Sequence, residues 1–121
     1  MNRFPSIRKN TEYQAVYKAG HSSATGLLVM YVMENGRDIS RLGISISKKV
    51  GNSVIRHRFS RKIREIFRLN KYRTKTGYDI IIVARNPAKE ASYKSLERDY
   101  VKLLSRHDII LSRDENQSES K

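Results

Sequence analysis

The sequence contains no cysteine and no tryptophan, only two prolines, and 12 acidic residues against 25 lysines and arginines. The lack of cysteine excludes a disulfide framework, a thiolate zinc site and a cysteine nucleophile. No apolar run reaches the length needed to cross a bilayer and the first residues do not resemble a secretion signal, so we expect a cytoplasmic protein without a membrane partner. The 121 residues have room for one modest core. We expect one domain over residues 1–111 and a polar tail, residues 112–121, that is predicted to be disordered.

The excess of positive charge lies in one part of the chain. The net charge is +13, and Met1 to Tyr78 contain 17 lysines and arginines against 4 acidic residues, whereas Asp79 to Lys121 contain 8 against 8. A charge that only keeps the protein in solution would be spread more evenly. The asymmetry therefore favours a polyanion bound by the first two-thirds of the chain, and an RNA-binding domain is the first interpretation.

Hydrophobic periodicity and turn residues predict seven elements. They are a helix from an Asn10 cap to Gly20, a short edge strand near 22–25, strands over 27–33 and 39–47, a helix over 54–69, a strand over 79–85 and a helix over 92–106. Asn35-Gly36 between two apolar strands predicts a hairpin that pairs them. The order indicates an α+β protein, a two-layer sandwich of helices on a small sheet. The general rule for parallel strands makes the crossover through the long helix right-handed.

The strand over 39–47 has two different faces. Leu42, Ile44 and Ile46 alternate with smaller residues and are expected in the core. The other face carries Gly43, Ser45 and Ser47. A ligand could lie against this small, polar face, although a face that only contacts water would look the same.

The helix predicted over 54–69 has an apolar side and a cationic side. Ile55, Phe59, Ile63, Ile66 and Phe67 fall within an arc of about 120°. Arg61, Arg64 and Arg68 lie on the opposite side, with Arg56, Arg58 and Lys62 on the flanks. Glu65 is the one acidic residue of this helix. The alternative of a helix stabilised by ion pairs is therefore disfavoured, because most of the basic residues would have no acidic partner. A row of guanidinium groups can follow a phosphate backbone. A membrane-surface helix is less favoured, since the core needs its apolar side.

The segment SKKVGNSVIRHRFSRKIRE, residues 47–65, closely resembles the signature of the bacterial ribonuclease P protein family. The family pattern is Lys-x-Gly-Asn-Ala-Val-x-Arg-Asn-Arg-x-Lys-Arg-x-x-Arg-Glu. Its Arg-Asn-Arg part reads Arg56-His57-Arg58 here, and the Lys-Arg pair that follows reads Ser60-Arg61-Lys62. The likeness extends to EYQAVYKAG, LVMYV, LGISISKKVGN and YDIIIVARNPA, and so covers nearly the whole chain.

The resemblance implies a fold and an activity. The implied fold has the order α-β-β-β-α-β-α, a mostly antiparallel sheet and a left-handed crossover around the basic helix. The implied function is that of the protein subunit of a ribonucleoprotein endonuclease that matures the 5′ end of tRNA. The RNA subunit, with its Mg²⁺, would carry out the hydrolysis, so the protein would hold no catalytic residue, metal site or cofactor. Its implied partners are the catalytic RNA and precursor tRNA, with no obligate protein partner.

The resemblance also assigns residues. The implied contacts of the catalytic RNA are Lys48, Lys49, Asn52, Arg56, Arg58, Arg61, Lys62, Arg64 and Arg68. The implied contacts of the precursor's 5′ leader are Tyr13, Tyr17, Tyr31, Ser45, Ser47 and Lys49. The residue types alone also suit a single strand, because aromatic rings stack on unpaired bases beside polar and basic groups. The alternative is that Tyr17 and Tyr31 are ordinary core residues.

The residues do not indicate a nuclease site within the protein. Glu12, Glu34, Asp38 and Glu65 are dispersed along the basic region, which disfavours a two-metal site. The three histidines, His21, His57 and His107, form no spacing pattern for an acid and a base. The open alternatives are a noncatalytic RNA binder of the ribosomal or RNA-chaperone kind and a nonspecific nucleic-acid-binding cation.

Overall fold

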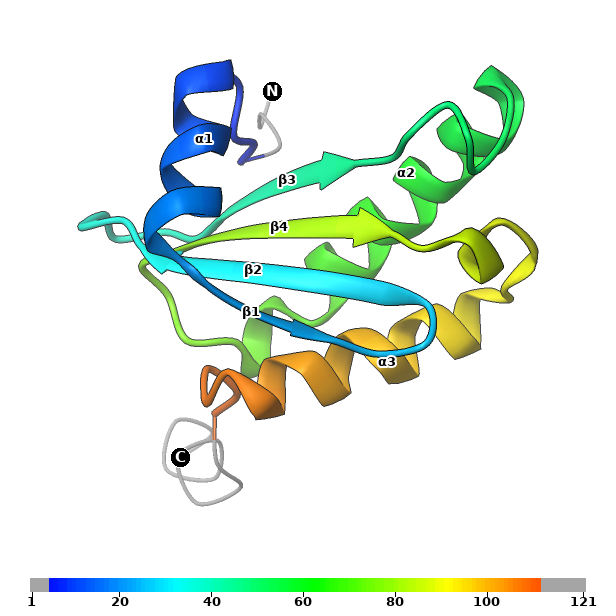
Figure 1. The fold of residues 1–121 in the computed structure, drawn as a ribbon. Helices are drawn as coiled ribbons and strands as arrows, with labels where there is room; N and C mark the ends of the chain where they lie inside the picture. Colours follow the sequence, from blue (N-terminus) through cyan, green and yellow to red (C-terminus); the bar gives the residue numbers. More distant parts are fainter. Residues whose placement is uncertain (1–4, 112–121) are drawn as a thin grey trace, which may run out of the picture.

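The computed structural model describes residues 5–111, and the predicted tail over 112–121 lies outside the described residues. The chain forms an α-β-β-β-α-β-α order with two short 3₁₀ helices (Figure 1). The elements are α1 (Asn10–Ala19), β1 (His21–Ala24), β2 (Leu28–Glu34), β3 (Arg41–Ser45), α2 (Ser53–Leu69), η1 (Lys71–Arg73), β4 (Tyr78–Ala84), η2 (Asn86–Glu90) and α3 (Tyr93–Arg106). The predicted fold class is confirmed, and each predicted helix and strand is present within a few residues.

The four strands form one mixed sheet in the order β1-β2-β4-β3. β1 pairs antiparallel with β2, β2 pairs antiparallel with β4, and β3 pairs parallel with β4. The hairpin predicted at Asn35-Gly36 is therefore wrong. Gly36 does adopt the positive φ of a turn, 69°, but β4 lies between the two strands that this turn connects.

Burial explains why β4 lies between β2 and β3. Ile80, Ile81 and Ile82 are all fully buried, so β4 is covered on both faces and belongs inside the sheet. One face of β3 carries Arg41, Gly43 and Ser45 and has little apolar surface, so this strand can lie at an edge. The outer edge of β3 is partly covered by the chain before α1, where the Ile7 amide donates to the Leu42 carbonyl at 2.9 Å.

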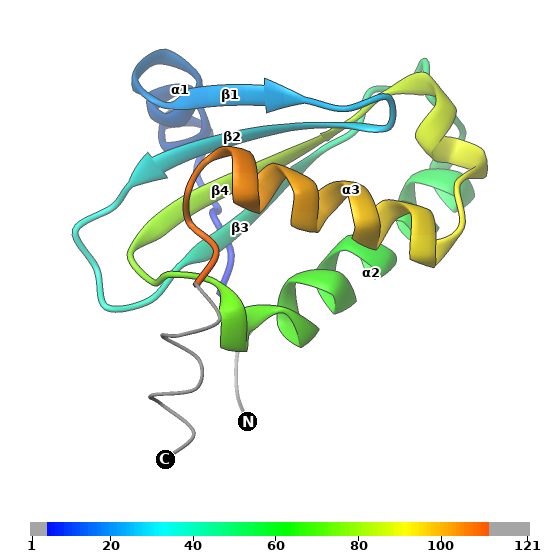
Figure 2. The ribbon, with the colours of Figure 1, turned by 90° about the horizontal axis from the view of Figure 1, so that it is seen from below.

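The connection from β3 through α2 to β4 is left-handed. Both strands run in the same direction in Figure 1, and Figures 1 and 2 together place α2 behind the sheet in that view. The general expectation of a right-handed crossover is therefore wrong, and the handedness implied by the family resemblance is confirmed. Leu42 and Ile44 supply the apolar face of β3. The Gly43 and Ser45 face has too little apolar surface to bury the side of α2 that carries Phe59 and Ile63.

Two hydrophobic cores lie on opposite faces of the sheet. α2 and α3 cover one face, and α1 covers one end of the other (Figure 2). The larger core combines Leu28, Met30, Val32, Leu42, Ile80 and Ile82 with Phe59, Ile63, Ile66, Phe67, Leu96, Tyr100, Leu103 and Leu104. The smaller core consists of Ile7, Val16 and Ile81, with Tyr13, Tyr17, Tyr31, Met33 and Val83 packed around it. Much of the face that bears α1 therefore remains open.

Side chains cap two of the three helix N-termini. Asn52 caps α2, and its Oδ1 accepts from the Ile55 amide at 3.0 Å. Ser92 caps α3 in the same way. The Asn10 cap predicted for α1 is wrong, because Lys9 occupies the cap position. The Glu12 carboxylate accepts from the Lys9 amide at 3.1 Å, and this bond starts the helix one residue early.

Candidate nucleic-acid interface

α2 separates its apolar and cationic residues as the periodicity predicts. Phe59, Ile63, Ile66 and Phe67 are buried against the sheet and α3. The exposed cations of the helix are Arg58, Arg61, Arg64 and Arg68. We call this set the cationic face of α2. A rigid helix thus carries four guanidinium groups in water while its other side is fixed in the core.

The cationic face is mostly uncompensated by acidic residues. Glu65 and Arg68 form an exposed pair, with Oε2 and Nη2 2.7 Å apart, and the hydrogen bond from Arg68 lowers the pKa of the Glu65 carboxyl. Within residues 5–111, Arg58, Arg61 and Arg64 form no salt bridge. The alternative of a helix held by ion pairs therefore accounts for one arginine only. The remaining guanidinium groups are available to an anionic partner.

The flanking cations of α2 lie closer to the protein. Arg56 is half-buried, and its Nε is buried without a hydrogen-bond partner among the described residues. The Lys62 Nζ donates to the Ala91 carbonyl at 3.3 Å. Asn52, a predicted RNA contact, uses its Oδ1 as the acceptor of the helix cap. These three residues border the cationic face; Arg56 and Lys62 are half-buried, and Asn52 is engaged in the helix cap.

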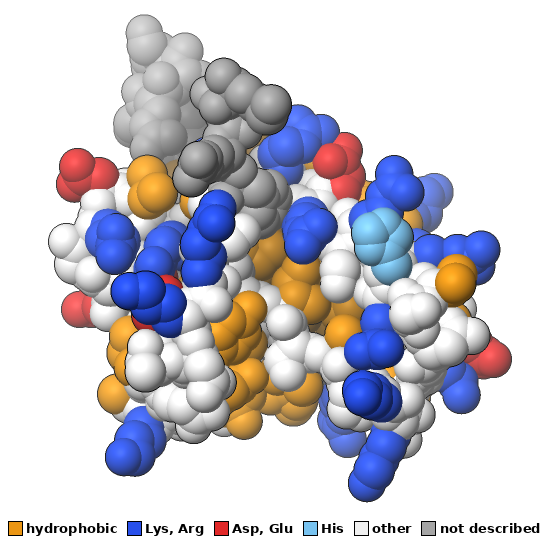
Figure 3. All heavy atoms as spheres, turned by 90° about the horizontal axis from the view of Figure 1, so that it is seen from above, with side chains coloured by type: hydrophobic (Ala, Val, Ile, Leu, Met, Phe, Trp, Pro, Cys, Tyr) orange, Lys and Arg blue, Asp and Glu red, His pale blue; other side chains and the backbone are white. Residues whose placement is uncertain are grey.

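A hollow lies over the open face of the sheet. Figure 3 shows it between two lobes, with a hydrophobic floor and with lysines and arginines on both lobes. α1 forms one lobe, and the connection from β3 into α2 forms the other. Four of the predicted leader residues belong to the elements of this face: Tyr13 and Tyr17 come from α1 and Tyr31 from β2, all three packed on the smaller core, and Ser45 comes from β3. We call this hollow the aromatic cleft.

Tyr17 packs between the other two tyrosines of the aromatic cleft. The rings of Tyr17 and Tyr31 meet edge to face, with centroids 4.9 Å apart and planes at 81°. Tyr13 and Tyr17 are 6.4 Å apart. All three are half-buried against the smaller core. They are therefore neither fully in the core nor free in solvent, and their partly exposed rings leave room for stacking.

Tyr13 also forms a hydrogen bond with the backbone of β3. Its hydroxyl accepts from the Ile44 amide at 3.2 Å. Its ring lies over Gly43, where an added Cβ would be 3.0 Å from two ring carbons and from the hydroxyl oxygen. The prediction that Gly43 faces an open surface is therefore wrong. Because glycine has no side chain, the Tyr13 ring can lie directly on Gly43. The surface over Gly43 is therefore filled by this ring and is not part of the open cleft.

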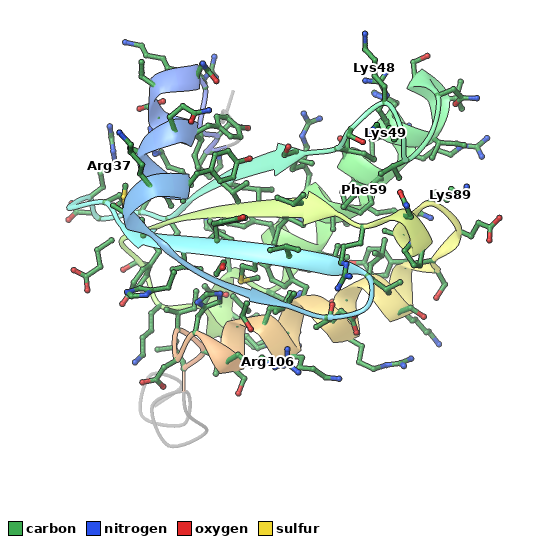
Figure 4. The ribbon with its side chains drawn as sticks, viewed as in Figure 1. Arg37, Lys48, Lys49, Phe59, Lys89 and Arg106 are labelled. Carbon is green, nitrogen blue, oxygen red and sulfur yellow. The ribbon has the colours of Figure 1, made fainter. Side chains whose placement is uncertain are left out.

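The second lobe presents the predicted lysines. Lys48 and Lys49 are exposed and lie across the open face from α1 (Figure 4). The Ser47 Oγ accepts from the Lys49 amide at 3.1 Å, which fixes the turn that leads into α2. The lysines thus lie between the aromatic cleft and the start of the cationic face.

A small cavity joins the two predicted surfaces. It measures about 150 Å³ and lies beside the outer edge of β3. Tyr13 lines it from the side of the aromatic cleft, and Ser60 and Arg64 line it from α2. The cationic face therefore begins where the aromatic cleft ends. One polyanion, or two that meet, could contact both.

Lys89 is a basic residue of this region that the sequence argument missed. It is exposed on η2 and, with Arg58 and Lys62, lines a notch of about 80 Å³ beside α2 (Figure 4). In the sequence it lies next to Glu90, in the last third of the chain, where the charges balance. Only the packing of η2 against α2 brings it to the cationic side.

α1 is held in place by a charged cluster at the start of β3. Arg41 donates to both oxygens of Asp79 and to the Glu12 carboxylate. The hydrogen bond to Asp79, and then the one to Glu12, raise the pKa of Arg41 above its ordinary value. The Lys9 amide, the Arg41 guanidinium and the Arg8 amide lower the pKa of Glu12 from 4.5 to about 2. The cluster ties the first turn of α1 to two strands.

Acidic and histidine side chains do not gather into a reactive site. Over the part of the chain that the structure describes, no three of them lie close enough to hold a metal ion. Glu12 and Glu65 are engaged by arginines. His107 lies with Nε2 3.0 Å from the Met30 carbonyl, and burial lowers the pKa of its imidazole.

Between Pro5 and Leu111 there is also no helix with the length and apolarity to span a membrane.

Comparison with known proteins gives consistent matches. The family model described as Ribonuclease P matches residues 1–108. A relative from Alkaliphilus oremlandii, called ribonuclease P protein component, is 46% identical over 112 residues, 93% of this chain and 98% of the relative. One from Clostridium novyi, with the same name, is 48% identical over 108 residues, 88% and 96% of the two chains.

Comparison with solved structures points to the same family as the sequence matches. The Staphylococcus aureus RNase P protein is 38% identical, with a TM-score of 0.81 over 88% of this chain and 98% of that one. The Thermotoga maritima RNase P protein is 30% identical, with a TM-score of 0.78 over 84% and 96%.

Proposed function

The chain belongs to the ribonuclease P protein family, and from this premise we propose that α2 binds the catalytic RNA while the aromatic cleft binds the 5′ leader of precursor tRNA. The family places the chain in the ribonucleoprotein endonuclease that matures the 5′ end of tRNA, and implies association with ribonuclease P RNA. The proposal assigns each nucleic acid to its own surface. The cavity between Tyr13 and Arg64 is where the two surfaces meet.

The observation that carries the proposal for the catalytic RNA is the uncompensated cationic face. Arg58, Arg61 and Arg64 are exposed on a helix whose opposite side is buried, and they have no acidic partner among residues 5–111. Like charges held this close cost stability unless a polyanion binds them. Lys48 and Lys49 extend the same charge to the start of the helix.

The leader proposal is supported by the half-buried tyrosines. Tyr17 and Tyr31 combine ring surface that can stack on unpaired bases with a backing of core residues that holds the rings in place. Ser45, Ser47 and Lys49 add polar and cationic groups on the other side. Stacking accepts any base, which suits leaders of different sequence.

We propose that the hydrolysis itself is carried out by the RNA subunit with Mg²⁺ bound to RNA. The dispersal of the acidic residues supports this, because Glu12 serves the α1 cluster and Glu65 is paired with Arg68. A metal site needs several oxygen ligands converging on one point. The protein would hold the substrate and the RNA together and would neutralise phosphates between them.

Reconstitution tests the proposal. The protein is added to ribonuclease P RNA at a magnesium concentration too low for the RNA alone, and cleavage of precursor tRNA is measured. We expect the protein to restore correct 5′ cleavage. RNA binding without restored cleavage would instead indicate a noncatalytic RNA-binding protein. Repeated turnover by the protein without RNA would contradict the assignment of the chemistry to RNA.

A further inference from the structure

A second basic surface lies at the far end of α2, away from Lys48 and Lys49. It is the segment Lys71–Thr76, which we call the η1 loop. α2 spans 17 residues, so the loop lies about 25 Å along the helix from its N-terminus. Figure 2 shows η1 at the C-terminal end of α2, directly after the helix. The loop is therefore remote from the aromatic cleft and continuous with the cationic face.

The η1 loop is fixed by Asn70, which is only 1% exposed. The Asn70 Nδ2 donates to the Ile66 carbonyl at 2.8 Å and to the Glu97 carboxylate at 3.0 Å. Its Oδ1 accepts from the Arg73 Nε at 2.8 Å, and its carbonyl accepts from the Thr74 hydroxyl at 2.7 Å. A buried amide with each of its groups satisfied holds the loop in one conformation.

The chain after α3 holds the loop from the other side. The Lys75 amide donates to the Ile109 carbonyl, and the Leu111 amide donates to the Arg73 carbonyl, both at 2.7 Å. A loop fixed at both sides loses little entropy when it binds a partner. The η1 loop is thus a preformed surface.

This rigid loop exposes apolar and aromatic groups that the fold does not use. Tyr72 is 65% exposed and Ile39, on the neighbouring turn, is 50% exposed. On the side of Ile39 the loop also borders an apolar niche of about 50 Å³, which is lined by Phe67 and Lys75 but not by Tyr72. The exposed ring of Tyr72 provides a flat surface on which an unpaired nucleobase can stack.

The charge around Tyr72 selects the kind of partner. Lys71, Arg73 and Lys75 are three cations within five residues, and the Arg73 guanidinium carbon lies 5.6 Å from the Tyr72 ring centroid. Asp38, beside Ile39, is the acidic residue of the same turn. This excess of cations with an exposed aromatic ring matches a nucleic acid better than an apolar protein surface.

We propose that the η1 loop is a second docking point for RNA, where Tyr72 stacks on an unpaired base and Lys71, Arg73 and Lys75 hold the adjoining phosphates. The inference rests on the proposed function, because the RNA concerned is the catalytic RNA that lies along α2. The loop extends that contact beyond the helix and makes no contact with the leader.

Two variants test the η1 loop, with affinity for ribonuclease P RNA as the measurement in the absence of precursor. Tyr72→Ala should weaken binding about fivefold or more, and Tyr72→Phe should not. Lys71→Gln with Lys75→Gln should make the slope of log affinity against log salt shallower by about 1.4. Arg73 is left intact because it bonds Asn70. Lys94→Gln with Lys102→Gln, two exposed lysines of α3, is the matched charge control.

The outcomes separate this inference from the proposed function. If Arg61→Gln with Arg64→Gln weakens RNA binding while the loop variants bind like the wild type, the loop is not a docking point and the proposed function stands. If neither set changes the affinity, the proposed function fails as well. A Tyr72→Ala protein that changes its self-association, measured by light scattering, and not its RNA affinity would assign the patch to contact between copies and overturn the inference.

Discussion

Arg41 and Asp79 are joined by two parallel hydrogen bonds, from Nε to Oδ1 at 2.9 Å and from Nη2 to Oδ2 at 2.7 Å. The pair links the first residues of β3 to β4, and the third guanidinium nitrogen, Nη1, reaches Glu12 on α1 at 3.0 Å. The side chain of Asp79 is only 3% exposed. One arginine therefore fixes the position of α1, and with it the tyrosine wall of the aromatic cleft, relative to the sheet.

Arg41→Ala should destabilise the protein strongly. The variant leaves the Asp79 carboxylate buried without its charged partner and with only the hydrogen bond from the Asn35 Nδ2, and breaking a buried pair in this way costs roughly 3 kcal/mol. Urea unfolding measures the loss. Glu65→Gln, which breaks an exposed pair of similar geometry, should leave the unfolding free energy nearly unchanged. Equal effects of the two substitutions would show that Arg41 has no special structural role.

Glu12 should make the fold sensitive to acid. Its pKa is lowered from 4.5 to about 2, so the stabilisation is fully present above pH 4.5 and is lost as the pH falls toward 2. Glu12→Gln lacks this titration. The wild type should therefore be the more stable protein at pH 6, and the two unfolding free energies should converge near pH 2. A constant difference over that range would contradict the role of the ionised carboxylate.

Gly43→Ala should disturb the aromatic cleft. The new methyl group would lie 3.0 Å from the Tyr13 ring, which must move and weaken its bond to the Ile44 amide. We expect a loss of about 1–3 kcal/mol in urea unfolding, with weaker binding of leader-bearing precursor. Gly26→Ala is the matched control, because no atom lies within 4 Å of its added Cβ. If both variants behave alike, the close packing of Tyr13 on Gly43 is unimportant.

Tyr17→Ala should weaken binding of precursor that carries a leader and spare leaderless tRNA. Loss of one stacked base costs about 1–3 kcal/mol. The ratio of the two affinities, measured with holoenzyme, separates the loss of leader stacking from any general loss of stability. Tyr17→Phe keeps the ring and should keep the ratio. An unchanged ratio for Tyr17→Ala would assign the side chain to the smaller core alone.

Arg61→Gln with Arg64→Gln should reduce both the affinity for ribonuclease P RNA and its dependence on salt. Each lost phosphate contact makes the slope of log affinity against log salt shallower by about 0.7. The double substitution should therefore change the slope by about 1.4. Both residues are exposed, so the fold should remain intact. A slope identical to that of the wild type would show that the cationic face does not contact the backbone of RNA.

The sequence alone determined the local structure and the character of the candidate surfaces. The stripe from Phe59 to Phe67 and the cap at Asn52 could be read from periodicity and residue type, because a helix is held by contacts within a few residues. The cationic face follows from the same helical geometry. The basic signature over residues 47–65 also indicated the family.

The tertiary structure alone decided how distant segments meet. Gly36 adopts a positive φ, as a turn glycine does, yet β4 lies between the two strands that it connects, because a strand buried on both faces lies most favourably inside the sheet. The bonds from Arg41 to Glu12 and Asp79 join residues 29 and 38 positions apart. Such contacts depend on which faces can bury apolar surface together, and no local pattern in the chain records that choice.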